Sequence, residues 1–160
     1  MKTVVIYYSV TGQTGFVAEK IAAMLGCDIF EIQTKEKIKP DLFSRYYKGI
    51  KSMLSKDETK LKDYKLNLND YDKIIVGFPN WGSMFPPAVK AFISHNDFSE
   101  KDICLFTTYV ARGAAQCLKN AAAFFTESNV SILGKFSLPK SKSDEEINRM
   151  LSEGLSAFKL

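Results

Sequence analysis

Short apolar segments alternate along this chain with segments of helical periodicity, and this alternation restricts the folds that the chain can adopt. The expected strands are residues 4–8, 28–33, 73–78, 102–108 and 130–138, and the expected helices are residues 17–25, 40–54, 86–95, 113–128 and 143–158. Each helix must return the chain to the edge at which the previous strand began, which makes neighbouring strands parallel. We therefore predict a doubly wound α/β fold, with a five-stranded parallel sheet in the order 2-1-3-4-5 and helices on both faces.

The length and composition are those of one globular domain. The chain has 160 residues, of which 46% are hydrophobic, and a chain of this size buries roughly two-thirds of the surface that it exposes when unfolded. Its apolar runs are too short to span a bilayer, and the first residues lack the small-residue cleavage pattern of a signal peptide. We expect a single domain over 1–160, without a membrane span and located in the cytoplasm.

The three cysteines, Cys27, Cys104 and Cys117, also fit a reducing compartment. Their count is odd and their spacing is not that of metal ligands. None of them begins the Cys-x5-Arg loop of thiol phosphatases, because the sixth residue onward is Gln33, Val110 or Ala123. We expect them to act as small buried apolar side chains.

The net charge of +4 is concentrated in one segment. Residues 35–65 hold ten basic and five acidic residues, an excess of +5, so the rest of the chain sums to −1. Such a local patch does not resemble the broad basic face of a nucleic-acid-binding protein, and we expect no nucleic-acid partner. The segment is either a solvated insertion or a docking surface for an acidic redox partner or an anionic substrate.

The turn after the first expected strand has the composition of a phosphate site. It consists of Ser9, Val10, Thr11, Gly12, Gln13 and Thr14. Its hydroxyls, together with the backbone N–H groups and the positive dipole end of the following helix, can surround a phosphate. The turn lacks the Gly-Lys-Ser/Thr ending of nucleotide-triphosphate loops. A terminal phosphate monoester held by neutral donors fits this composition better, although such a cluster also serves as an ordinary turn and helix N-cap.

A second polar loop follows the third expected strand. It contains Pro79, Asn80, Trp81, Gly82 and Ser83, a tryptophan and a flexible pair that suit an aromatic ring with a polar edge. In a sheet of this order, ligands bind beyond the carboxyl ends of the first and third strands. The two loops are therefore expected to meet there, although Trp81 could instead be part of the core.

Three segments resemble the FMN-binding loops of the flavodoxin family. These are Tyr-Ser-Val-Thr-Gly-Gln-Thr over residues 8–14, Gly-Phe-Pro-Asn-Trp-Gly-Ser-Met-Phe-Pro-Pro over 77–87 and Phe-Thr-Thr-Tyr over 106–109. The resemblance spans nearly the whole chain and implies a flavodoxin-like fold with FMN as cofactor. The third loop departs from the family pattern, because Tyr-Val-Ala-Arg-Gly over 109–113 stands where paired glycines or an acidic residue before an aromatic one are common.

The resemblance also implies a role for each loop residue. The hydroxyls of Ser9, Thr11 and Thr14 and the N–H groups of Gly12 and Gln13 would hold the phosphate. Residues 79–82 would border the isoalloxazine ring. Backbone groups of residues 80–83 would contact flavin N5 or ring oxygens, and the Gly82 peptide could reorient as N5 is protonated. Thr108, Tyr109 and Gly113 would lie along the pyrimidine edge or the opposite ring face.

Arg112 is the departure that matters most for redox chemistry. A cation beside the ring would stabilise the charge gained on reduction and raise the reduction potential. Arg112 could equally point into solvent, and Tyr109 could be a packed strand end. The single histidine, His95, is expected at a helix C-terminus in a structural role.

Three functions remain open from the sequence. The first is an electron carrier that uses FMN to shuttle electrons between redox partners. The second is an FMN enzyme that passes hydride from NAD(P)H to a quinone. The third is a non-enzymatic module that binds another phosphate ligand. Triad hydrolysis, structural zinc and phosphoacceptor chemistry are not supported, because their residue patterns do not occur; we expect no metal and assign no catalytic side chain.

Overall fold

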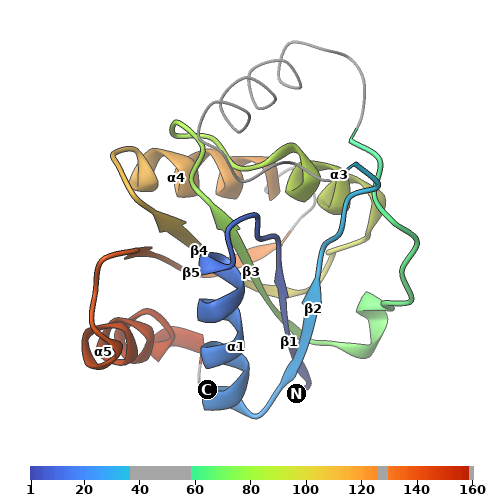
Figure 1. Cartoon of the computed structure of the whole chain (residues 1–160). Coiled ribbons are helices and arrows are strands. Elements are labelled where there is room, and N and C mark those ends of the chain that lie inside the picture. The colour runs from blue at the N-terminus through green and yellow to red at the C-terminus, as the bar shows by residue number, and fades with distance from the viewer. Residues whose placement is uncertain (37–58, 126–129, 159–160) are drawn as a thin grey trace.

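The computed structural model describes residues 1–36, 59–125 and 130–158, and these residues build one five-stranded parallel sheet (Figure 1). Its strand order is β2-β1-β3-β4-β5, and each neighbouring pair runs parallel. The predicted fold class and strand order are confirmed.

The elements follow the expected alternation. The strands are β1 (Thr3–Tyr7), β2 (Asp28–Glu31), β3 (Lys73–Pro79), β4 (Asp102–Tyr109) and β5 (Ser131–Pro139). The α-helices are α1 (Gln13–Leu25), α3 (Pro87–His95), α4 (Ala114–Phe125) and α5 (Asp144–Gly154), and two short 3-10 helices are η1 (Leu68–Asp70) and η3 (Ser156–Phe158).

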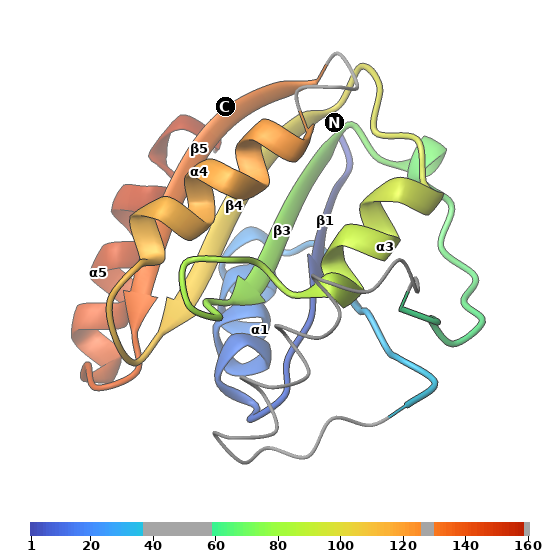
Figure 2. The same cartoon turned by 90° about the horizontal axis from the view of Figure 1, so that it is seen from above.

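Two apolar cores lie on opposite faces of the sheet, and Figure 2 shows α3 and α4 on one face and α1 and α5 on the other. Successive strand side chains point to opposite faces. Ile74 and Val76 therefore join the core beneath α3 and α4, whereas Ile75 lies in the core beneath α1 and α5. Helices cover both faces of β3 and β4, which explains why the sequences of these strands are nearly continuous apolar runs.

The helix ends follow from local sequence signals. Gly26 ends α1 in a left-handed conformation with φ 61°, which glycine adopts without steric cost. Pro87 occupies the first turn of α3, where its missing N–H is not needed. A capping box starts α5: Ser143 Oγ accepts the Glu146 N–H, and the Glu146 carboxylate accepts the Ser143 N–H.

The last helix is shorter than predicted. The α-helix ends at Gly154, and Phe158 lies in the separate 3-10 helix η3. Leu155 and Phe158 are nevertheless buried in the core beneath α1 and α5. Apolar spacing therefore located the buried side chains, but it could not distinguish a continuing α-helix from a tighter terminal turn.

Some predictions lie outside the described residues. They are the expected helix over 40–54, most of the basic segment 35–65 and the end of the helix expected over 113–128. At the described ends of the basic segment, the Lys35 N–H donates to the Lys60 carbonyl and the Lys62 N–H donates to the Gln33 carbonyl. These bonds place residues 60–62 beside the end of β2.

The three cysteines form no disulfide, and two of them are core side chains. Cys104 and Cys117 are fully buried, whereas Cys27 is half-buried. Burial raises the pKa of both core thiols to about 12, because it disfavours the thiolate. No helix among the described residues has the length and apolar character needed to cross a membrane.

We predict that only Cys27 reacts with iodoacetamide while the protein is folded. The buried thiols are shielded from the reagent and remain protonated in mildly alkaline buffer. Mass spectrometry should find a single alkylated cysteine in native protein and three in guanidinium. Rapid labelling of Cys104 or Cys117 without denaturant would contradict this packing.

Candidate functional site

Three loops meet at the carboxyl edge of the sheet. They connect β1 to α1, β3 to α3 and β4 to α4, and they leave the sheet at the same edge (Figure 1). The Asn80 N–H donates to the Thr108 carbonyl at 2.9 Å, and Thr14 and Thr108 are joined through their side chains. The loops predicted to form one site are therefore adjacent.

The β1–α1 loop presents the start of helix α1 without a side-chain cap. Gly12 is the N-cap residue with φ 88°, and no acidic residue lies in the first turn of the helix. A Cβ atom at Gly12 would have no heavy atom within 4 Å. Thr11 and Gly12 are exposed, and Ser9 and Val10 are partly exposed. An anion can therefore approach the helix N-terminus, which favours negative charge.

One contact in this loop differs from its expected role. The Gly12 N–H donates to Ser9 Oγ at 3.2 Å, so it is already bonded within the loop. Because a hydroxyl both donates and accepts, Ser9 keeps its own proton for a second partner. The uncapped start of α1 leaves the N–H of Gln13, which is partly exposed, as the more direct backbone donor.

Thr14 lies beneath the loop instead of on its surface. Its side chain is 2% exposed, and its Oγ1 is 2.7 Å from Oγ1 of Thr108, which is 3% exposed. Either hydroxyl can be the donor. This hydrogen bond joins the first turn of α1 to the end of β4, two segments 94 residues apart. It fixes two predicted site residues relative to each other.

The β3–α3 loop contains a tight two-residue turn. Backbone N–H and carbonyl groups of Trp81 and Met84 pair with each other at 2.9 and 3.1 Å. The two central residues, Gly82 and Ser83, have φ values of 58° and 72°. Two positive φ values in a two-residue hairpin are the pattern of a type I′ turn.

Asn80 connects this turn to the β4–α4 loop. Its Oδ1 accepts the Ser83 N–H at 3.0 Å, and its Nδ2 donates to the Arg112 carbonyl at 2.9 Å. Gly113 has φ 100°, and a Cβ atom there would lie 2.2 Å from Ser83 Oγ. A side chain at position 113 would therefore push the two loops apart.

Trp81 is partly buried and packs over Tyr8. The two rings meet edge to face, with centroids 6.2 Å apart. The indole Nε1 atom is buried, and the structure gives it no hydrogen-bond partner. A buried donor without an acceptor is costly. Burial also raises the pKa of the Tyr8 hydroxyl. The polar edge of Trp81 is therefore a place where an additional acceptor would be stabilising.

The β4–α4 loop is the most exposed of the three. Val110 is 80% exposed, Arg112 is exposed, and Tyr109 is partly exposed. The Tyr109 carbonyl accepts the Lys140 N–H at 3.0 Å, which joins this loop to the loop after β5. The Arg112 guanidinium can therefore reach a ligand lying over the loops or face solvent.

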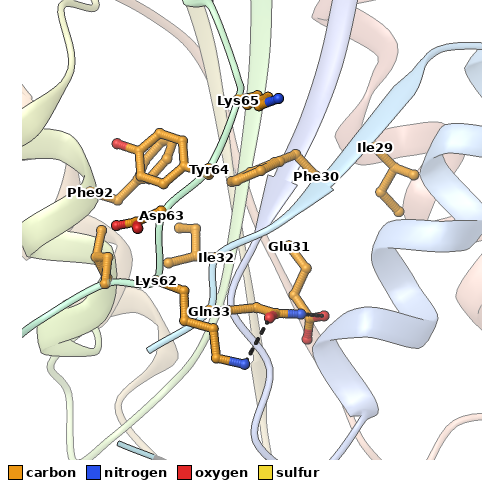
Figure 3. Close-up of a pocket in the computed structure, with 11 residues that line it drawn as sticks. Ile29, Phe30, Glu31, Ile32, Gln33, Lys62, Asp63, Tyr64, Lys65 and Phe92 are labelled. Carbon is orange, nitrogen blue, oxygen red and sulfur yellow. Dashed lines mark hydrogen bonds between the residues drawn. The ribbon is translucent and has the colours of Figure 1, made fainter. Parts of the chain in front are cut away.

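A separate groove lies beside β2, as Figure 3 shows. It has a volume of about 350 Å³ and is lined by residues 29–33, 61–65 and Phe92. Phe30, Tyr64 and Phe92 form its aromatic wall, with ring centroids 5.4 to 5.8 Å apart. None of the site residues predicted from the sequence lines this groove.

The comparison with protein families decides the classification. The sequence model of the family described as Flavodoxin matches residues 2–153. The chain belongs to the flavodoxin family.

Among the described residues, no cluster of three or more His, Cys, Asp or Glu side chains could hold a metal ion.

Solved structures share the fold of this flavodoxin-family chain. A Bacteroides uniformis protein is 27% identical, with a TM-score of 0.77, and the match covers 92% of this chain and 96% of that one. A Lactobacillus acidophilus flavoprotein solved in complex with FMN is 19% identical, with a TM-score of 0.76 and coverages of 93% and 97%. Oxidised flavodoxin 2 from Bacillus cereus is 17% identical, with a TM-score of 0.67 and coverages of 99% and 97%. A search of the curated proteins found no match.

Three residues that support the loops were not predicted from the sequence. Tyr8 lies under Trp81, Cys117 contacts the Trp81 backbone, and Asn120 contacts Ser83 and Met84. The available signal in the sequence was an asparagine within the alanine-rich segment of α4, because asparagine is a poor helix former. Its partner could not be read from the sequence.

We predict that Thr14 and Thr108 are energetically coupled. Thr14→Val or Thr108→Val alone leaves one buried hydroxyl without its partner, which costs about 1–3 kcal/mol of unfolding free energy. The double variant removes both hydroxyls and should be destabilised by less than the sum of the single effects. Urea unfolding of the four proteins measures this coupling, and strictly additive effects would contradict the hydrogen bond.

Proposed function

We propose that this protein binds FMN at the three loops and acts as an electron carrier between redox partners. The observation that supports this most strongly is the uncapped N-terminus of α1 beside the Trp81–Met84 turn, in a chain of the flavodoxin family. Bound FMN would supply one- and two-electron redox chemistry. The roles of the protein residues are to bind the phosphate, orient the ring and set the charge around it.

The residues of the β1–α1 loop fit a terminal phosphate. Ser9 and Thr11 offer hydroxyl donors, Gln13 offers the N–H of the first helical residue, and the first turn carries no opposing carboxylate. The open space around Gly12 leaves room for phosphate oxygens. Thr14 would contribute by fixing the helix start through Thr108.

The two remaining loops fit the ring. Residues 79–83 would border it, and the buried Trp81 Nε1 donor would gain an acceptor from a polar group of the cofactor. Thr108, Tyr109 and Gly113 would lie toward its pyrimidine edge. The close approach of Gly113 to Ser83 would keep these loops at a fixed separation, so that the ring edge meets a preformed surface.

We predict that Thr11→Ala weakens FMN binding by about 10- to 100-fold, because it removes one hydrogen bond to a charged phosphate. Trp81→Ala should also weaken binding, since it removes part of the ring site. A titration of purified protein, followed by flavin fluorescence and visible absorption, measures both effects. Ser152→Ala, which removes an exposed hydroxyl on α5, is the matched control and should leave the affinity unchanged.

Two results would overturn the proposed function. If the wild-type protein takes up no FMN, the loops serve another phosphate ligand. If the FMN-loaded protein oxidises NAD(P)H rapidly with a quinone in the steady state, it is a reductase. An electron carrier should instead reduce its acceptor at a useful rate only when a separate reductase is added.

We predict that Arg112→Ala lowers the reduction potential of bound FMN. A cation near the ring stabilises the negative charge gained on reduction. At the separations typical of surface charges, its removal should lower the reduction potential by about 20–50 mV. Potentiometric titration measures the shift, and Lys119→Ala, at an exposed position of α4, is the control. An unchanged or higher potential in Arg112→Ala would contradict the prediction that the guanidinium stabilises the reduced ring.

A further inference from the structure

Asn120 contacts the predicted ring site from outside it. It lies on α4 and is partly exposed. Its Nδ2 donates to the Ser83 carbonyl at 3.0 Å and contacts Met84 Sδ at 3.2 Å. Its Oδ1 accepts Gln116 Nε2 from one turn earlier at 2.8 Å. The amide is thus oriented by its own helix, with the donor directed at the turn of the neighbouring loop.

The turn that Asn120 contacts is strained at one residue. Gly82 and Ser83 have positive φ values, which are easy for glycine but unfavourable for serine. Rotation of the Gly82–Ser83 peptide would convert a type I′ turn into a type II′ turn, in which Ser83 has a negative φ. That rotation would break the bond from the Ser83 N–H to Asn80 Oδ1. The strain therefore favours reorientation, and hydrogen bonds must oppose it.

We propose that Asn120 is a positioning residue, which clamps the Ser83 carbonyl and thereby holds the Trp81–Met84 turn in the orientation that binds the cofactor. Asn80 holds the N–H of Ser83, and Asn120 holds its carbonyl on the other side of the same residue. Asn80 opposes the peptide rotation directly, and Asn120 anchors the carbonyl on the other side of the Ser83 N–Cα bond about which that rotation occurs. The part of this proposal that concerns the cofactor rests on the proposed FMN site.

The first test measures the turn without any cofactor. In the full chain before FMN is added, Asn120→Ala should speed hydrogen exchange at the Ser83 and Met84 amides by about fivefold, the effect of losing one ordinary hydrogen bond. Adding Ser83→Gly should bring exchange back toward the wild-type rate, because glycine adopts φ 72° without strain. Lys119→Ala, at the exposed neighbouring position of α4, removes none of the hydrogen bonds of Asn120, and it should leave both amides unchanged.

The second test measures cofactor binding by the same variants. Asn120→Ala should raise the Kd for FMN by about fivefold, Asn120→Ala/Ser83→Gly should restore it, and Lys119→Ala should not alter it. Urea unfolding establishes that each variant is folded under the binding conditions. Rescue by a glycine at position 83 separates a role in holding this turn from a general loss of stability.

The outcomes separate this inference from the proposed function. Unchanged exchange in Asn120→Ala would show that Asn120 does not hold the turn and would overturn the inference. Faster exchange with an unaltered Kd would overturn the positioning role while leaving FMN binding intact. If wild-type protein binds no FMN, the proposed function fails together with the cofactor part of the inference, whereas the exchange data still decide whether Asn120 clamps the turn.

Discussion

The burial of β3 and β4 on both faces is the constraint on which the rest of the structure depends. Helices α1 and α5 cover one face and α3 and α4 the other, so these strands can lie only in the middle of a parallel sheet. Parallel strands deliver their carboxyl ends to one edge, where the loops after β1, β3 and β4 come together. The packing leaves no room for a side chain at position 77, because a Cβ atom at Gly77 would lie 2.0 Å from the ring of Phe106. The core thus determines where the site is, before any residue of the site is considered.

At that edge, a small set of hydrogen bonds converts three neighbouring loops into one surface. The hydrogen bond between Thr14 and Thr108 joins the start of α1 to the end of β4, and Asn80 joins the β3–α3 loop to the β4–α4 loop. Both bonds connect segments that are distant in sequence. The Thr14–Thr108 bond is buried, where a lost partner is costly, whereas the Asn80–Arg112 bond is exposed. The surface that results has an uncapped helix start on one side and a strained turn on the other. These are the features that the proposed FMN site would use to hold the phosphate and to border the ring.

Much of the fold could be predicted because its signals are local. Alternation of apolar runs with helical spacing gave the strands, the helices and their order, and Gly26, Pro87 and the Ser143–Glu146 box marked helix ends. The end of α5 was wrong, because Leu155 and Phe158 keep helical spacing although the chain tightens into η3. The β1–α1 loop and the Trp81 loop were predicted to be binding loops from their residue types and from their positions after buried strands, and the structure places these loops side by side. Their individual contacts were not predicted: Thr14 was expected to face a ligand, and it is instead buried against Thr108.

The sequence by itself determined the fold class, the strand order, the edge at which the loops meet and the residue types available there, because periodicity and turn chemistry act over a few neighbouring residues. Only the tertiary structure decided which of those residues face outward and which hold their neighbours in place. Thr14 meets Thr108 across 94 positions, and Asn120 meets Ser83 across 37. Such pairs form because two loops and a helix are fixed side by side by the cores beneath them. No local sequence pattern encodes contacts between residues so far apart, so the contact of Asn120 with Ser83 became visible only in three dimensions.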